Sequence, residues 1–145
     1  MAIKRITQLD QETLAQLVAI WLKTNQEAHP FIASDYWVKN ELMVKNQLPQ
    51  ATLFVSFDGA EVTGFLGLQD AYVAGLFIKK AHQGSGLGKA LLEAAKKESS
   101  TLTLAVYEKN ERAMQFYLSQ GFQLVKVQLD EETGEKEAIL EWHRA

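Results

Sequence analysis

The chain of 145 residues is 47% hydrophobic and carries 15 basic against 18 acidic side chains, which gives a net charge of -3. This length supports one hydrophobic core, so we expect a single domain over residues 1–145, and the charge lacks the basic excess that binding to a nucleic-acid backbone requires. The absence of cysteine excludes disulfides, thiolate metal sites and an acyl-cysteine intermediate, and the absence of a long apolar stretch predicts a cytoplasmic protein without a membrane partner.

The first third of the chain is predicted to hold a short strand and two helices. The strand covers residues 3–6, and Asp10 is placed to cap the first helix. The apolar residues of that helix recur at helical spacing and form one buried face: Leu14, Leu17, Val18, Trp21 and Leu22. A polar loop over residues 25–34 then leads to Ser34, which is placed to cap a second helix over residues 35–46.

The middle of the chain is predicted to form three strands in antiparallel order. Residues 53–57 and 62–68 are rich in β-forming side chains and are separated by Asp58-Gly59, which favours a hairpin. Residues 71–78 continue the sheet. Gly75 within them indicates a bulge or a close approach of another group to the backbone.

The last third is predicted to add a parallel strand, a helix and a hairpin. Residues 101–107 follow a helical crossover and should therefore lie parallel to the preceding strand. Asn110 is placed to cap a helix that ends at Gly121, and residues 122–129 and 137–142 form the closing hairpin. The whole order predicts an α+β fold with a mixed, mostly antiparallel sheet of about six to seven strands, one parallel pair and about four flanking helices.

A glycine-rich loop, Gln83-Gly84-Ser85-Gly86-Leu87-Gly88, separates an apolar strand from a helical pattern. Glycines admit a ligand close to the backbone, and the first helical turn offers N–H groups to a phosphate. Spacing excludes the dinucleotide motif G-x-G-x-x-G, because its third glycine would fall at Lys89. It also excludes the nucleoside-triphosphate loop, because Gln83 and Ala90 occupy the places of a glycine and a hydroxyl residue.

Two motifs together resemble the GNAT family of N-acetyltransferases. The loop meets the family pattern [QR]-x-x-G-x-[GA] at Gln83, Gly86 and Gly88. The second motif is a capping asparagine, an alanine, an aromatic-tyrosine pair and glycine-phenylalanine, and it is filled in order by Asn110, Ala113, Phe116, Tyr117, Gly121 and Phe122. His29-Pro30-Phe31 and the region of Trp37 are also similar to small bacterial members of the family. The resemblance implies the GNAT fold over the whole chain.

The resemblance implies acetyl-coenzyme A as co-substrate and no metal. In the family the pyrophosphate lies over the glycine loop and the pantetheine pairs with a splayed strand, as an added strand would. Transferred to matching positions, the coenzyme site comprises Leu76, Phe77, Ile78, Gln83, Gly84, Ser85, Gly86, Leu87, Gly88, Lys89, Asn110, Ala113, Phe116 and Tyr117.

The implied reaction is direct attack of a primary amine on the thioester in a ternary complex. Tyr117 holds the position of the family's general acid, which donates a proton to the leaving thiolate. An amine with pKa ≈ 10.4 is almost entirely protonated near neutrality, so it needs a base or a water path. Asp70, Glu108 and His29 are the candidate bases.

The acceptor is left open by the sequence. Its site is expected near His29, Phe31, Tyr36 and Trp37. A small polyamine-like or amino-acid-like amine, an antibiotic and a protein amine all suit the reaction. The competing function is a non-catalytic module that binds or senses coenzyme A. Either a monomer or a homodimer is compatible with the pattern, because the edges of the last hairpin could pair between chains.

Overall fold

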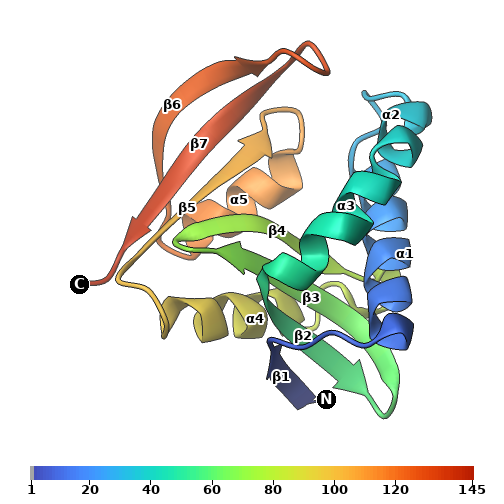
Figure 1. Ribbon diagram of the computed structural model, residues 1–145. Coiled ribbons are helices and arrows are strands. Elements are labelled where there is room, and N and C mark those ends of the chain that lie inside the picture. Colours follow the sequence, from blue (N-terminus) through green and yellow to red (C-terminus); the bar gives the residue numbers. More distant parts are fainter. Residues whose placement is uncertain (1) are drawn as a thin grey trace.

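The computed structural model describes residues 2–145, and its strands form one sheet in the order β1-β2-β3-β4-β5-β7-β6 (Figure 1). Every neighbouring pair is antiparallel except β4 and β5, which are parallel. The predicted α+β class and the single parallel pair are therefore confirmed. The strands are β1 (Ala2–Ile6), β2 (Thr52–Asp58), β3 (Glu61–Gln69), β4 (Tyr72–Ile78), β5 (Thr101–Tyr107), β6 (Gln123–Asp130) and β7 (Glu135–His143).

In the described part of the chain, residues 2–145, five α-helices accompany the sheet: α1 (Gln11–Ala28), α2 (Ser34–Lys39), α3 (Glu41–Gln47), α4 (Leu87–Lys96) and α5 (Glu111–Ser119). Short 3₁₀ turns lie at Leu48–Gln50 and Lys80–His82. Figure 1 shows α1, α2 and α3 grouped together, away from α4 and α5. Among residues 2–145, no helix has both the length and the apolar character needed to cross a bilayer.

The sheet separates two hydrophobic cores. Side chains of a strand alternate between its faces, so β2 directs Leu53 and Val55 to the core beneath α1 and α3, and Phe54 to the core beneath α4 and α5. The first core also holds Leu17 of α1, and the second holds Leu91 of α4. The helices of the two cores thus lie on opposite faces of the sheet.

The region after residue 34 differs from the prediction, because one expected helix is two. The chain bends at Asn40 between α2 and α3, with φ -94° and ψ 0°. Asn40 Nδ2 donates to Tyr36 O at 2.7 Å and so engages a carbonyl that a continuous helix would pair with a backbone amide. Ser34 is the first helical residue rather than a cap, and Ala33 precedes it without a side-chain bond.

The two other predicted caps are confirmed. Asp10 accepts a hydrogen bond from Thr13 N at 2.7 Å, and Asn110 Oδ1 accepts one from Ala113 N at 3.2 Å. Each satisfies one of the amide groups that the first turn of a helix leaves without an internal partner. The cap at Asn110 also fixes the direction in which its amide nitrogen points.

Candidate active site

Strands β4 and β5 separate along their length. They pair only at Tyr72 and Thr103, where Thr103 N donates to Ala71 O at 2.9 Å. Beyond that point β4 stays with β3 as far as Ile78, and β5 stays with β7 as far as Tyr107. The parallel strands therefore open toward their carboxyl ends, and one edge of β4 there has no pairing with β5. An extended ligand can bond to such an edge.

A bulge shapes β4 within this opening, as predicted at Gly75. The register with β3 shifts between Gly67 and Leu68, which pair with Gly75 and Val73 and leave Ala74 without a partner of its own. A Cβ atom at Gly75 would lie 2.3 Å from the ring of Phe77. Only glycine lets the Phe77 ring fold back over the strand at this point.

The glycine loop leads from β4 into α4 and presents the start of that helix. Gly84 and Gly86 have φ of 77° and 85°, and a Cβ at either would meet no atom within 4 Å. Gly86 O accepts the first helical bond, from Ala90 N at 3.1 Å. The amides of Leu87, Gly88 and Lys89 precede that bond and so have no helical carbonyl to pair with. The loop therefore forms an anion cradle: its glycines have positive φ, it leaves open space, and it lies at the positive end of the α4 dipole.

Gln83 is held by its neighbours at the entrance of the cradle. Its Nε2 donates to Ile78 O at 3.0 Å, and its Oε1 accepts from Arg112 Nη1 at 3.2 Å. Ser85 Oγ donates to His82 O at 2.6 Å. Gln83 is thus hydrogen-bonded to the end of β4. It also holds the guanidinium of Arg112, from α5, beside the loop.

Helix α5 packs against the first turn of α4. A Cβ at Gly88 would lie 3.5 Å from Phe116 Cζ and 3.8 Å from Leu76 Cδ2, so this glycine permits close packing. Tyr117 is 8% exposed, and its ring meets Phe116 and Phe122 at centroid distances of 5.3 and 5.6 Å. Burial raises the pKa of Tyr117 above its ordinary value, which keeps the phenol protonated at neutral pH.

Trp37 is another buried aromatic side chain within the described residues 2–145. In this part of the chain Trp37 Nε1 is the one enclosed side-chain nitrogen or oxygen without a partner. The Trp37 ring makes edge contacts with Trp21 and Tyr36 at 5.8 and 5.0 Å.

An aromatic cluster lies at the carboxyl end of β5 and brings together the residues predicted for the acceptor. His29 stacks on Trp37 with ring centroids 5.2 Å apart and meets Phe31 and Tyr107 edge-on at 5.6 and 5.2 Å. Tyr36 adjoins the other side of Trp37. The α1–α2 loop is thus joined to the end of β5, next to the cap of α5.

The hydrogen bonds of His29 define its tautomer. Asn110 Oδ1 accepts from Ala113 N, so its Nδ2 is the donor toward His29 Nε2 at 3.3 Å. His29 Nδ1 then carries the proton and donates to Asn25 O at 3.1 Å. Burial lowers the pKa of His29. The imidazole is neutral, and its lone pair is occupied by an amide.

The other two candidate bases lie apart from each other. Asp70 precedes β4, is exposed and has φ of 53°, whereas Glu108 follows β5 and is also exposed, with its backbone N donating to Lys136 O at 3.0 Å. Because β4 and β5 run parallel, these carboxylates lie at opposite ends of the two strands. Asp70 is at the end away from the glycine loop.

The tip of the β6–β7 hairpin reaches α2 and the end of β5 (Figure 1). Tyr36 Oη donates to Glu132 Oε2 at 2.9 Å, and Tyr107 Oη donates to Asp130 Oδ2 at 2.6 Å. Burial and these bonds raise the pKa of both tyrosines, and the charge of Glu137 contributes for Tyr36. The aromatic cluster is therefore bordered by several carboxylates.

A family model described as an acetyltransferase (GNAT) domain matches residues 49–124, from the turn before β2 to the start of β6. The chain belongs to this family. The match spans the glycine loop, the opening between β4 and β5, and the whole of α5. The protein is a GNAT acetyltransferase.

Relatives within the GNAT family cover most of the chain. It is 29% identical over 139 residues, 94% of its length and 95% of the relative's, to a protein of Escherichia coli K12 named peptidyl-lysine N-acetyltransferase YiaC. It is 34% identical over 110 residues, 75% of each chain, to peptidyl-lysine N-acetyltransferase YjaB of the same organism. The solution structure of apo YjaB from Escherichia coli superposes with a TM-score of 0.84 over 100% of both chains, at 30% identity. The PaiA N-acetyltransferase of Thermoplasma acidophilum, in complex with coenzyme A, shares the fold with a TM-score of 0.79 over 99% of both chains, at 19% identity.

Several residues of this GNAT site were missed by the sequence analysis. Arg112 was missed because only its position two residues after a capping asparagine signals it. Tyr107, Asp130 and Glu132 were missed because their pairings join segments between 23 and 96 residues apart. The pattern of residues 130–137 indicated a turn. It did not indicate that the carboxylates of this turn would bond to Tyr36 and Tyr107.

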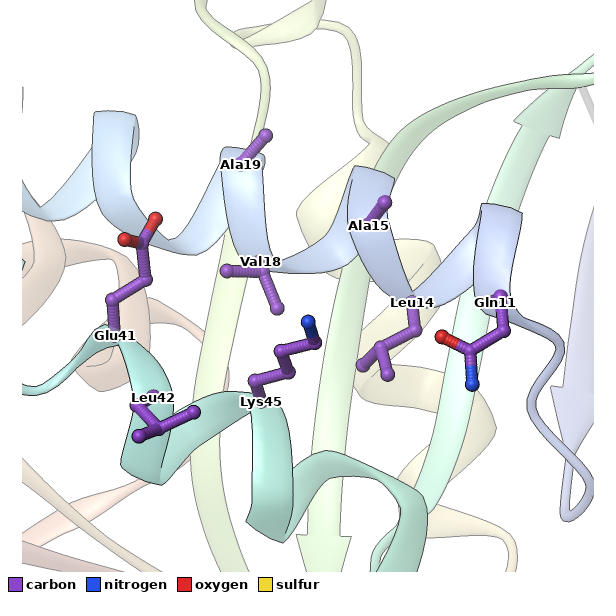
Figure 2. Close-up of a pocket in the computed structure, with 8 residues that line it drawn as sticks. All are labelled: Gln11, Leu14, Ala15, Val18, Ala19, Glu41, Leu42 and Lys45. Carbon is purple, nitrogen blue, oxygen red and sulfur yellow. The ribbon is translucent and has the colours of Figure 1, made fainter.

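A hollow of this GNAT domain lies away from the glycine loop, between α1 and α3 (Figure 2). Its volume is about 450 Å³ and its floor is formed by Leu14 and Val18, with Lys45 pointing from α3 toward α1. No residue of β4, α4 or α5 lines it. Within residues 2–145, no group of three or more His, Asp or Glu side chains is arranged to hold a metal ion.

Proposed function

We propose that the protein transfers the acetyl group of acetyl-coenzyme A to the side-chain amine of a lysine in a protein or peptide, in a bacterial cytoplasm. The observation that carries the proposal is the opening between β4 and β5, with an anion cradle at its end and Tyr117 on the adjoining helix. Two relatives bear the name peptidyl-lysine N-acetyltransferase. The carboxylates of the β6–β7 hairpin add a negative border that attracts a cationic amine.

Coenzyme binding is assigned to the loop and the unpaired edge of β4. The amides of Leu87, Gly88 and Lys89 bond the pyrophosphate oxygens, and Arg112 adds positive charge beside them. Pantetheine amides pair with the backbone of residues 76–78 as a short added strand. An N–H group of β4 at the bulge then stabilises the oxyanion that forms on the thioester carbon.

Acetyl transfer follows as one addition and one elimination. The neutral amine attacks the carbonyl carbon, the C–S bond breaks, and the sulfur receives a proton from the Tyr117 hydroxyl. The amine nitrogen loses a proton to water, and the phenolate left on Tyr117 regains a proton from water. This path is favoured because the lone pair of His29 is engaged by Asn110, and because Asp70 and Glu108 lie exposed at opposite strand ends.

The test follows free thiol release from acetyl-coenzyme A with lysine-containing peptides, spermidine-like amines and an aminoglycoside as acceptors. We expect turnover with the peptides and a mass gain of one acetyl group on lysine. The matched control is a peptide in which arginine replaces lysine, which keeps the charge and removes the nucleophile. Coenzyme binding without turnover on any acceptor would instead support a sensing module, and turnover on the small amines alone would contradict the peptide acceptor.

A further inference from the structure

Strand β6 is an unprotected edge of the sheet. It is the last strand in the sheet order, pairs only with β7, and exposes all of its residues from Gln123 to Leu129. Three of its apolar side chains, Leu124, Val127 and Leu129, are 54%, 43% and 57% exposed. An exposed apolar edge of this length is a template for pairing with another strand.

The opposite edge of the sheet, strand β1, is protected against pairing with another strand. Strand β1 is five residues long and carries two adjacent cations, Lys4 and Arg5. Arg5 forms an ion pair with Glu98, and Lys4 lies over the ring of Phe57 at 5.4 Å. Short length and charge discourage pairing at β1, whereas β6 has eight residues and one cation, Lys126.

We propose that two copies of the chain join through β6, antiparallel to itself and centred on Gln128, so that their sheets become continuous. The register shift between Leu124 and Lys126 leaves residues 126–130 as the regular part of the strand, and Gln128 is its midpoint. Self-pairing about Gln128 sets Lys126 opposite Asp130 of the partner subunit, twice by symmetry. Opposite charges directly across strands stabilise the pairing.

On the other face of β6, the same self-pairing brings apolar side chains of the two copies together. The same register sets Val127 opposite Leu129 of the partner subunit. Leu124 and Val127 pair across β7 with the buried residues Leu140 and Ala138, so they lie on the face covered by α5. Association would remove these apolar side chains from water together.

Asp130 is already fixed for this contact. Its Oδ2 accepts from Tyr107 Oη, and its Oδ1 accepts from Glu132 N at 3.1 Å. Each carboxylate oxygen retains a second lone pair, so an ammonium group can be added without breaking either bond. The dimer contact thus reaches the hairpin that borders the aromatic cluster, although the proposal does not depend on which acceptor the site takes.

Sedimentation equilibrium of the full chain from about 1 to about 300 µM tests the proposal. We expect a dimer that Lys126→Asp weakens by about tenfold or more, because two attractive pairs become repulsive. The double variant Lys126→Asp with Asp130→Lys should restore dimerisation. Lys136→Asp is the matched control, because it makes the same charge change on the same hairpin but on β7, away from the free edge.

Val127→Lys tests the edge without touching Asp130, and it should also shift the equilibrium to monomer. Thermal melting establishes that each variant is folded. A monomeric wild type over the whole range would overturn the proposal, as would a dimer that Lys126→Asp and Val127→Lys leave unchanged. If the wild type is a monomer and an extended acceptor peptide binds along β6, the proposal is overturned, because β6 then pairs with that peptide and not with a second copy of the chain.

Discussion

His29 and Asn110 are 81 positions apart in the chain, and their side-chain nitrogens lie 3.3 Å from each other. The contact joins the α1–α2 loop to the cap of α5, the helix that carries Tyr117. It also fixes the tautomer of a half-buried histidine. The α1–α2 loop and the start of α5 are therefore linked through a neutral hydrogen bond.

We predict that the burial of His29 makes stability depend on pH. Burial lowers the pKa of His29 below 6.5, so in the window beneath that value the unfolded chain binds a proton that the folded chain does not. The free energy of unfolding should fall as pH drops through this window. His29→Gln, which cannot titrate there, should show a shallower fall in urea unfolding between about pH 5 and pH 8. An equal fall in both proteins would contradict the assignment.

Tyr117→Phe should lower kcat by about a hundredfold and leave coenzyme affinity almost unchanged, because only the proton donor is removed. Its ring contacts with Phe116 and Phe122 remain, so the melting temperature should stay close to that of the wild type. Thiol release and calorimetric titration with coenzyme A measure the two effects. Tyr72→Phe, which removes an exposed hydroxyl, is the control. Unchanged turnover would mean that Tyr117 only packs in the core and is not the proton donor.

In the wild type, the raised pKa of Tyr117 predicts that its ionisation causes no loss of activity below the ordinary tyrosine value near pH 10. The phenol stays protonated and keeps its proton to donate. The pH dependence of kcat with a saturating acceptor measures this. A loss of activity at mildly alkaline pH that disappears in Tyr117→Phe would show that this hydroxyl ionises there.

Gly75→Ala should reduce both stability and turnover, because its Cβ would lie 2.3 Å from the Phe77 ring. Displacing that ring disturbs the bulge, and overpacking of this kind costs about 1–3 kcal/mol. Gly67→Ala is the control, since Gly67 pairs with Gly75 and its nearest atom to a new Cβ is 3.8 Å away. Urea unfolding and thiol release should separate the two variants. Equal behaviour would mean that the ring adjusts at little cost.

Gly86→Ala should weaken coenzyme binding, since alanine is strained at φ 85° and the loop must be in this form to present its amides. Gly59→Ala, at φ 62° in the β2–β3 turn, imposes a similar backbone strain far from the loop. Calorimetric titration with coenzyme A should show a lower affinity for the first variant alone. If both variants bind like the wild type, the phosphates lie elsewhere.

The order of the elements and the geometry of the glycine loop could be predicted because their signals are local. A capping side chain acts within three residues, as at Asp10 and Asn110, and Gly75 signals a bulge by its own lack of a side chain. The break at Asn40 was missed because it depends on a single side chain capturing a nearby carbonyl. The bond of Tyr36 to Glu132 could not be predicted, because the fold alone brings residues 96 positions apart together.

The two hydrophobic cores meet back to back on β2 and β3 and share few side chains. A substitution in α1 or α3 repacks the core beneath them, while the layer that supports α4, α5 and the glycine loop keeps its own contacts. A change in the packing of α1 or α3 should therefore leave the positions of α4, α5 and the glycine loop almost unchanged. One sheet thus supports two cores that can be repacked one at a time.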